Sequence, residues 1–162
     1  MKLKLFGMGV LCALALPLLA QDKPFDYHSS AELQQKAQQT MAKAVASPGG
    51  SAGEKIASYG DHAITIAART KSGGPEIHEQ WTDVIMVTGG QATLLIGGTA
   101  VGEVAAEGGA PGEKRGSDIT GGTMQVVKKG DIINIPAGTP HWIKIAPGDD
   151  FSYVNVKVKR NS

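Results

Sequence analysis

The segment Gly130-Asp-Ile-Ile-Asn-Ile-Pro136-Ala-Gly138-Thr-Pro140-His141 decides the fold, because it places a short strand between two turns. Gly130-Asp131 is typical of a tight turn, and the isoleucines that follow favour a β-strand, where β-branched side chains pack well. Pro136-Ala-Gly138 predicts the second turn. His141 begins the next strand, over residues 142–145, and its ring shares a face with every second side chain there. In a closed barrel this face is the interior.

From residue 55 onwards the chain repeats this pattern of short strands and Gly-rich turns. We expect about eight strands, the number in a jelly-roll barrel: Lys55–Tyr59, His62–Arg69, Val84–Val87, Gln91–Ile96, Met124–Lys128, Ile132–Ile135, Trp142–Ile145 and Phe151–Lys159. In the last strand valines alternate with Asn155, Lys157 and Lys159, and we interpret the valine face as the core side.

A second group of polar residues lies upstream of this segment. Glu76-Ile-His78 is followed by four residues and then by Asp83, and six further residues lead to Gly90. Residues 76 and 78 share one face of an extended strand, because side chains alternate along it. Asp83 begins the next strand and can point back at them.

These two segments resemble the two motifs of the cupins. The second cupin motif, G-x5-P-x-G-x2-H, is matched throughout residues 130–141, and Ile145 stands where the family usually has Asn. The first motif, H-x-H-x3,4-E-x6-G, is matched in altered form: Glu76 replaces the first histidine, His78 is retained, and Asp83 replaces the glutamate. The resemblance covers roughly residues 60–158. It implies a double-stranded β-helix, or jelly-roll barrel, of the small single-domain cupin type-2-like form found in secreted bacterial proteins.

The cupin register implies that Glu76, His78, Asp83 and His141 converge inside the barrel as ligands of a metal ion. Imidazole and carboxylate suit divalent Mn, Fe, Zn, Ni or Cu, and two histidines with one carboxylate form the facial triad of non-haem iron enzymes. Without a cation, burial of four ionisable side chains would be costly. We therefore expect nitrogens of the two rings to lie within ~5 Å, close enough to share an ion with bonds of ~2.1 Å.

Each of these residues also has a purely structural interpretation. His141 can close the turn by bonding a backbone carbonyl, and Glu76 can lie in water at the rim. Asp83 is one methylene shorter than Glu, so its oxygen can fall ~1.5 Å short of the ion.

Three functions fit this site. The first is a metal-dependent enzyme, an oxygenase, isomerase or lyase, in which the metal is a Lewis acid and Glu76 or Asp83 moves a proton on a small organic molecule. The second is a non-catalytic module that binds a metal or small molecule. The third is a metal-free, degenerate cupin with a structural role, whose barrel Ile143, Ile145 and Val156 would pack shut. Phosphoryl transfer and serine hydrolysis have no motif here.

Residues 1–20 predict a secretory signal peptide, and hence a secreted or periplasmic protein. Lys2 and Lys4 precede an apolar run, Leu5–Ala20, that is shorter than the ~20 residues that span a bilayer. Cleavage changes the formal charge from +1 to −1 and removes Cys12, the only cysteine. We therefore expect neither nucleic acid nor, after cleavage, a membrane as partner, and no thiol chemistry.

Residues 21–54 predict a leader, a helix and a Gly-rich linker, before a cupin barrel over residues 55–160. The helix should run from about Ser30 to Ala46, with Ser29-Ser30-Ala31-Glu32 as its cap. Its apolar stripe is thin, so we expect it to lie against the outside of the barrel or against a second subunit in a homodimer. Gly97–Gly122, rich in Gly, Ala and charge, predicts a mobile surface loop or a lid over the barrel mouth.

Overall fold

The computed structural model describes residues 25–160, so the predicted signal peptide lies outside the described residues. The described chain forms one helix and twelve strands: α1 (Ser30–Ala46), β1 (Ser51–Ser58), β2 (His62–Arg69), β3 (Glu76–His78), β4 (Trp81–Ile96), β5 (Thr99–Val101), β6 (Val104–Ala105), β7 (Glu113–Arg115), β8 (Asp118–Thr120), β9 (Thr123–Lys128), β10 (Ile132–Ile135), β11 (His141–Lys144) and β12 (Phe151–Lys159). No helix in residues 25–160 is long and apolar enough to cross a membrane.

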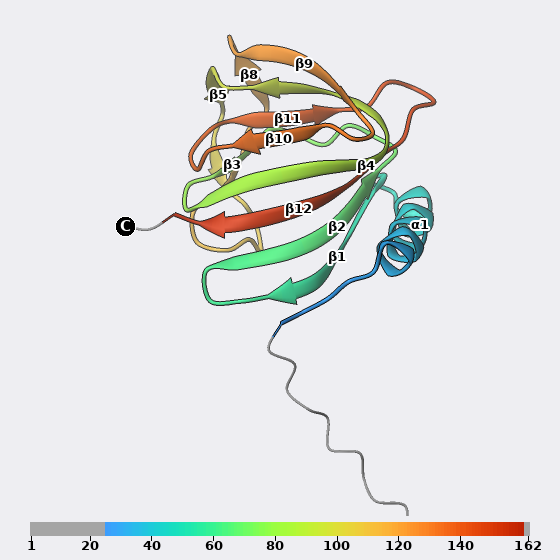
Figure 1. Ribbon diagram of the computed structural model, residues 1–162. Helices are drawn as coiled ribbons and strands as arrows, with labels where there is room; N and C mark the ends of the chain where they lie inside the picture. The colour runs from blue at the N-terminus through green and yellow to red at the C-terminus, as the bar shows by residue number, and fades with distance from the viewer. Residues whose placement is uncertain (1–24, 161–162) are drawn as a thin grey trace, which may run out of the picture.

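The long strand β4 joins the two halves of the barrel (Figure 1). Its first half pairs with β10 and β12, and its second half pairs with β9 and β11. Beyond β12 the sheet continues through β2 to β1, and beyond β11 it continues through β3 and β7 to β6. Every pairing is antiparallel. The fold is thus the all-β jelly-roll barrel with one N-terminal helix that the sequence predicts.

The predicted strands Val84–Val87 and Gln91–Ile96 are one strand of 16 residues, so the turn expected between them is wrong. Gly90 has φ +66°, and a Cβ there would lie 2.0 Å from the carbonyl oxygen of Asp150. The register with β12 also shifts beside it, between Ser152 and Tyr153. Glycine therefore bends β4 and lets it pass from one half of the barrel to the other.

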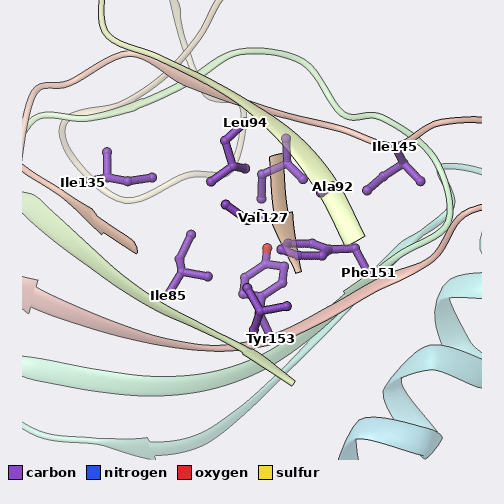
Figure 2. Packing of buried hydrophobic residues seen from close by; sticks show 10 residues of the cluster. Ile85, Ala92, Leu94, Val127, Ile135, Ile145, Phe151 and Tyr153 are labelled. Carbon is purple, nitrogen blue, oxygen red and sulfur yellow. The ribbon is translucent and has the colours of Figure 1, made fainter. Parts of the chain in front are cut away.

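The apolar core fills one part of the barrel interior (Figure 2). Its buried members come from both sides of the barrel: Ile85, Val87, Ala92, Leu94, Val127, Ile135, Ile143, Ile145, Phe151 and Tyr153. Three of them, Ile85, Ile143 and Tyr153, also line the cavity described below. Part of the cavity wall is therefore formed by the core.

Helix α1 lies against the outside of β1 and β2, as predicted (Figure 1). Ser29 caps it by accepting a hydrogen bond from the backbone N–H of Glu32 at 3.2 Å, and Ala44 is its fully buried apolar contact. The segment expected to be a flexible linker is shorter than predicted, because β1 begins at Ser51. Contact of this helix with a second subunit stays a prediction.

Residues 97–122 are not a structureless loop, which corrects the prediction. Strand β5 pairs with β8, β6 pairs with β7, and β7 pairs with β3. The pairing of β7 with β3 places Glu113 opposite His78 and Arg115 opposite Glu76. This segment therefore extends the sheet and forms a wall beside the candidate ligands.

The two faces of β12 are the reverse of the prediction. Tyr153, Asn155 and Lys157 line the internal cavity, so the valines, which alternate with them, face the outer side of the sheet. On that side Val154 is paired with Ile66 and Met86 and is buried. The prediction failed because the barrel interior is polar at this end of the strand.

Candidate metal centre

Three strands bring the predicted ligands to one place. Glu76 and His78 lie two apart on β3, Asp83 lies near the start of β4, and His141 begins β11. Glu76 and His141 are directly paired residues of neighbouring strands. All four line a cavity of about 430 Å³, and both histidines and Asp83 are buried.

The turns of the second motif hold β3 and β11 together. Gly138, with φ +80°, donates its backbone N–H to the carbonyl of His78 at 2.9 Å. Thr139 donates its N–H to the carbonyl of Pro136 at 3.1 Å, which closes the turn before His141. The local turn chemistry of this motif thus fixes the separation of the two histidines.

The side chains meet through one nitrogen of each ring. Nε2 of His78 lies 3.3 Å from Oδ2 of Asp83 and 3.6 Å from Oε2 of Glu76. Nε2 of His141 lies 3.6 Å from the same Asp83 oxygen. Asp83 therefore reaches both histidines despite its shorter side chain.

The other nitrogen of each ring, Nδ1, contacts a group on the side away from the carboxylates. Nδ1 of His141 donates to the carbonyl of Thr139 at 3.0 Å. Nδ1 of His78 forms an ion pair with Glu113, in a geometry that is not that of a hydrogen bond. These contacts leave both Nε2 atoms directed at the point where the carboxylates converge.

Basic and amide groups hold the two carboxylates. Arg69 donates to Oε1 of Glu76 at 3.2 Å, and Arg115 lies 3.7 Å from the same oxygen. Asn155 donates to Oδ1 of Asp83 at 3.1 Å. Each carboxylate therefore keeps its second oxygen for the histidines.

The pKa values follow from burial and these contacts. Burial opposes the charge on Glu76, but its contacts with His78, Arg69 and Arg115 prevail and lower its pKa to about 2. Burial likewise opposes the charged form of His78, but Asp83 and Glu76 outweigh it and raise its pKa to about 9. The pKa of Asp83 is lowered by His78 despite its burial. Burial lowers the pKa of His141, which favours the neutral imidazole that binds metals.

The donor set fits a transition-metal ion. One ligand atom from each of Glu76, His78 and His141 lies within 4.8 Å of the others. This meets the separation expected from the sequence, and two imidazoles with a carboxylate suit a divalent transition metal. Two ligand atoms with bonds of ~2.1 Å to one ion lie ~3.4 Å apart at the tetrahedral angle, so these atoms must move closer together to share an ion.

Sequence reasoning missed five charged or amide side chains that line the same cavity: Arg69, Glu113, Arg115, Asn155 and Lys157. Two of them, Asn155 and Lys157, could have been found in the sequence. They alternate with valines along β12, and this pattern fits equally well a strand whose polar face lines the barrel interior. Glu113 and Arg115 had none, since they lie in a Gly-rich segment with little periodicity.

No family model and no curated protein sequence matches the chain. Among solved structures, the cupin domain of Cnp3 from Schizosaccharomyces pombe has a TM-score of 0.50 at 8% identity, over 68% of this chain and 65% of that one. A cupin-2 domain from Rhodospirillum rubrum has a TM-score of 0.49 at 10% identity, over 69% and 62%. The polyketide cyclase RemF from Streptomyces resistomycificus has a TM-score of 0.47 at 19% identity, over 68% of each chain.

The first of these structures, together with the strand topology, identifies the architecture. At such low identity the likeness concerns the backbone and not the activity. The chain has the jelly-roll fold of the cupins.

Proposed function

We propose that this protein binds a divalent transition metal through Glu76, His78 and His141, together with a small organic ligand in the barrel. Asp83 is a fourth ligand or the base that moves a proton. The metal is Mn, Fe, Zn, Ni or Cu, the ions that suit imidazole and carboxylate. The observation that carries the proposal is the convergence of these side chains in an open cavity of about 430 Å³.

The chain's own residues prepare this site for chemistry. The metal would supply a Lewis acid beside the cavity. Thr139 orients His141, and Arg69 and Asn155 orient the two carboxylates. Asp83, which contacts both rings, is placed to accept or return a proton. Such a site would serve an oxygenase, an isomerase or a lyase, and the same site without turnover would be a binding module.

His141→Ala tests the metal site. We expect the variant to keep its β fold and to lose most of the bound metal, which elemental analysis of the purified protein measures. Added metal should raise the melting temperature of the wild type and not that of the variant, because a ligand of the native state stabilises it by mass action. His62→Ala is the matched control, since His62 is partly exposed and contacts Asp61. Equal metal content in all three proteins would contradict the proposal.

Asp83→Asn separates the two roles of the second carboxylate. The substitution keeps the shape and removes the charge. A ligand should lose metal affinity, whereas a proton-transferring base should keep the metal and lose turnover.

One observation favours the metal-free alternative. Burial of the carboxylates does not require a metal, contrary to the expectation from sequence, because Arg69, Arg115 and Lys157 line the cavity with them. In a degenerate cupin, these ion pairs would stabilise the fold without any metal. A purified protein that takes up none of the five metals would support that alternative.

We also propose that residues 1–20 are cleaved and that the protein is secreted or periplasmic. The basic start and apolar run of this segment support the proposal. The N-terminal sequence of the mature protein tests it. A homodimer stays a prediction, which the molar mass in solution tests.

A further inference from the structure

We propose that the cavity takes a small organic carboxylate, held by the metal and by the side chains of Arg115 and Lys157. The inference rests on the proposed metal site and adds the class of its ligand. It comes from the charges that line the cavity and from the exposure of its basic groups.

The cavity lining has no excess of acid to neutralise a metal ion. Its three carboxylates belong to Glu76, Asp83 and Glu113, and its three cationic side chains are those of Arg69, Arg115 and Lys157. These formal charges cancel. A divalent ion bound by neutral imidazoles therefore leaves two net positive charges in a partly enclosed site. An anion is the ligand that such a site favours, because opposite charges interact strongly where water is scarce.

Two of the three cations are accessible to a ligand. Arg69 is largely buried against Glu76, but the side chains of Arg115 and Lys157 are 45% and 28% exposed. Arg69 lies closer to Oε1 of Glu76, at 3.2 Å, than Arg115 does, at 3.7 Å. Arg115 can therefore turn to a ligand while Arg69 keeps Glu76 in place. An exposed guanidinium also binds a carboxylate through two parallel hydrogen bonds.

Lys157 pairs with Glu113 at 3.0 Å and lines both the cavity and a second one beside it. A neighbouring cavity of about 370 Å³ shares Thr65, Glu113 and Lys157 with the first, and Tyr59 and Trp81 line it. A carboxylate beside Lys157 can thus extend its organic part towards these two aromatic rings. The combined shape suits a small organic acid, because ligand cavities are mostly apolar with a few placed polar groups.

Calorimetry on the metal-loaded protein tests the inference with matched pairs of probes. The carboxylates are acetate, succinate and benzoate, and the neutral probes are acetamide, succinamide and benzamide. We expect at least one carboxylate to bind about tenfold or more tightly than its amide, which is the gain from one charge-assisted hydrogen bond. It should bind more weakly to protein stripped of metal. Equal affinity for each acid and its amide, or no binding of any acid by the loaded protein, would overturn the inference.

Variants locate the contact. Arg115→Gln and Lys157→Gln should each weaken carboxylate binding about tenfold when the variants are compared at saturating metal. Lys114→Gln is the matched control, because Lys114 points away from the cavity to Glu79 and Glu103. If Lys114→Gln weakened binding as much as Arg115→Gln, a general surface field would explain it and the inference would fail. If the protein never takes up metal, both the proposed function and this inference are wrong. If the metal-loaded protein binds none of the three acids, only this inference is wrong.

Discussion

The two parts of the barrel interior differ in character although the same strands build them. Where β12 begins, Phe151 packs into the apolar core, and further along the same face Asn155 and Lys157 line the polar cavity. Strand β4 is divided in the same way, with Asp83 in the cavity and Leu94 in the core. Each of these two strands therefore contributes apolar core residues at one end and polar cavity residues at the other. We expect substitutions in the core to change the free energy of unfolding, and substitutions in the cavity to change what the barrel binds.

Phe151→Ala should give the largest effect on stability. Phe151 is fully buried at 0% exposure, and loss of such a ring leaves a cavity that costs about 3–5 kcal/mol. Urea unfolding followed by circular dichroism measures the change. Phe25→Ala is the control, because Phe25 is 64% exposed. The metal affinity of the folded variant should stay within a factor of about three, since Phe151 does not line the cavity that holds the ligands. A large loss of metal affinity would show that the two parts of the barrel are coupled.

The sequence predicts the elements whose pattern is local. The bounds of β2, β10 and β12 agree with the prediction, and each of these strands begins directly after an aspartate of the preceding turn: Asp61, Asp131 and Asp150. His141 is predicted because its motif contains the turn that positions it, and His78 is predicted because it is the retained histidine of the first motif. Local pattern does not specify which face of a strand is inside.

The failures depend on contacts between distant segments. Glu113 meets His78 only because β7 pairs with β3, across 35 positions of the chain. Nothing within the Gly-rich segment around Glu113 encodes that pairing. The polar face of β12 was misassigned for a related reason: its partners in the cavity, Arg69 and Asp83, lie on other strands. A polar interior reverses the rule that the apolar face is buried.

The pH dependence of stability distinguishes the metal-free cavity from the metal-bound one. Burial lowers the pKa of His78, but Asp83 and Glu76 prevail and raise it to about 9, above the ~6.5 of an unfolded chain. Between about pH 6.5 and 9 the native state therefore holds a proton on His78 that the unfolded chain has lost. The contribution of this proton to the free energy of unfolding, up to about 3 kcal/mol, is complete below about pH 6.5. It is lost as the pH rises through about 9.

Urea unfolding of the stripped protein at several pH values measures this slope. His78→Gln should remove it, and the apolar core should contribute none. Metal binding must displace the proton from His78, so metal affinity should rise with pH over the same window. Stripped protein whose stability rises from pH 6.5 to 9 would contradict the assignment of this proton to His78.

Glu113→Gln should give the smallest of these effects. It tests whether a cavity residue can change metal affinity without changing the free energy of unfolding. Glu113 contacts Nδ1 of His78 and also pairs with Lys157 at 3.0 Å, so it positions the ring without being a ligand itself. Carboxylates behind metal-binding histidines typically affect metal affinity about 10- to 100-fold. Glutamine keeps the shape and one oxygen, so we expect the lower end, about tenfold, with little change in unfolding. Titration with Co²⁺ measures both the affinity and the visible spectrum, which should shift if the His78 ring reorients. Glu103→Gln, in the same segment but paired with Lys114, should alter neither. An unchanged spectrum and affinity in Glu113→Gln would show that the sheet alone orients His78, because β3 and its neighbours would then hold the ring without help from the charge behind it.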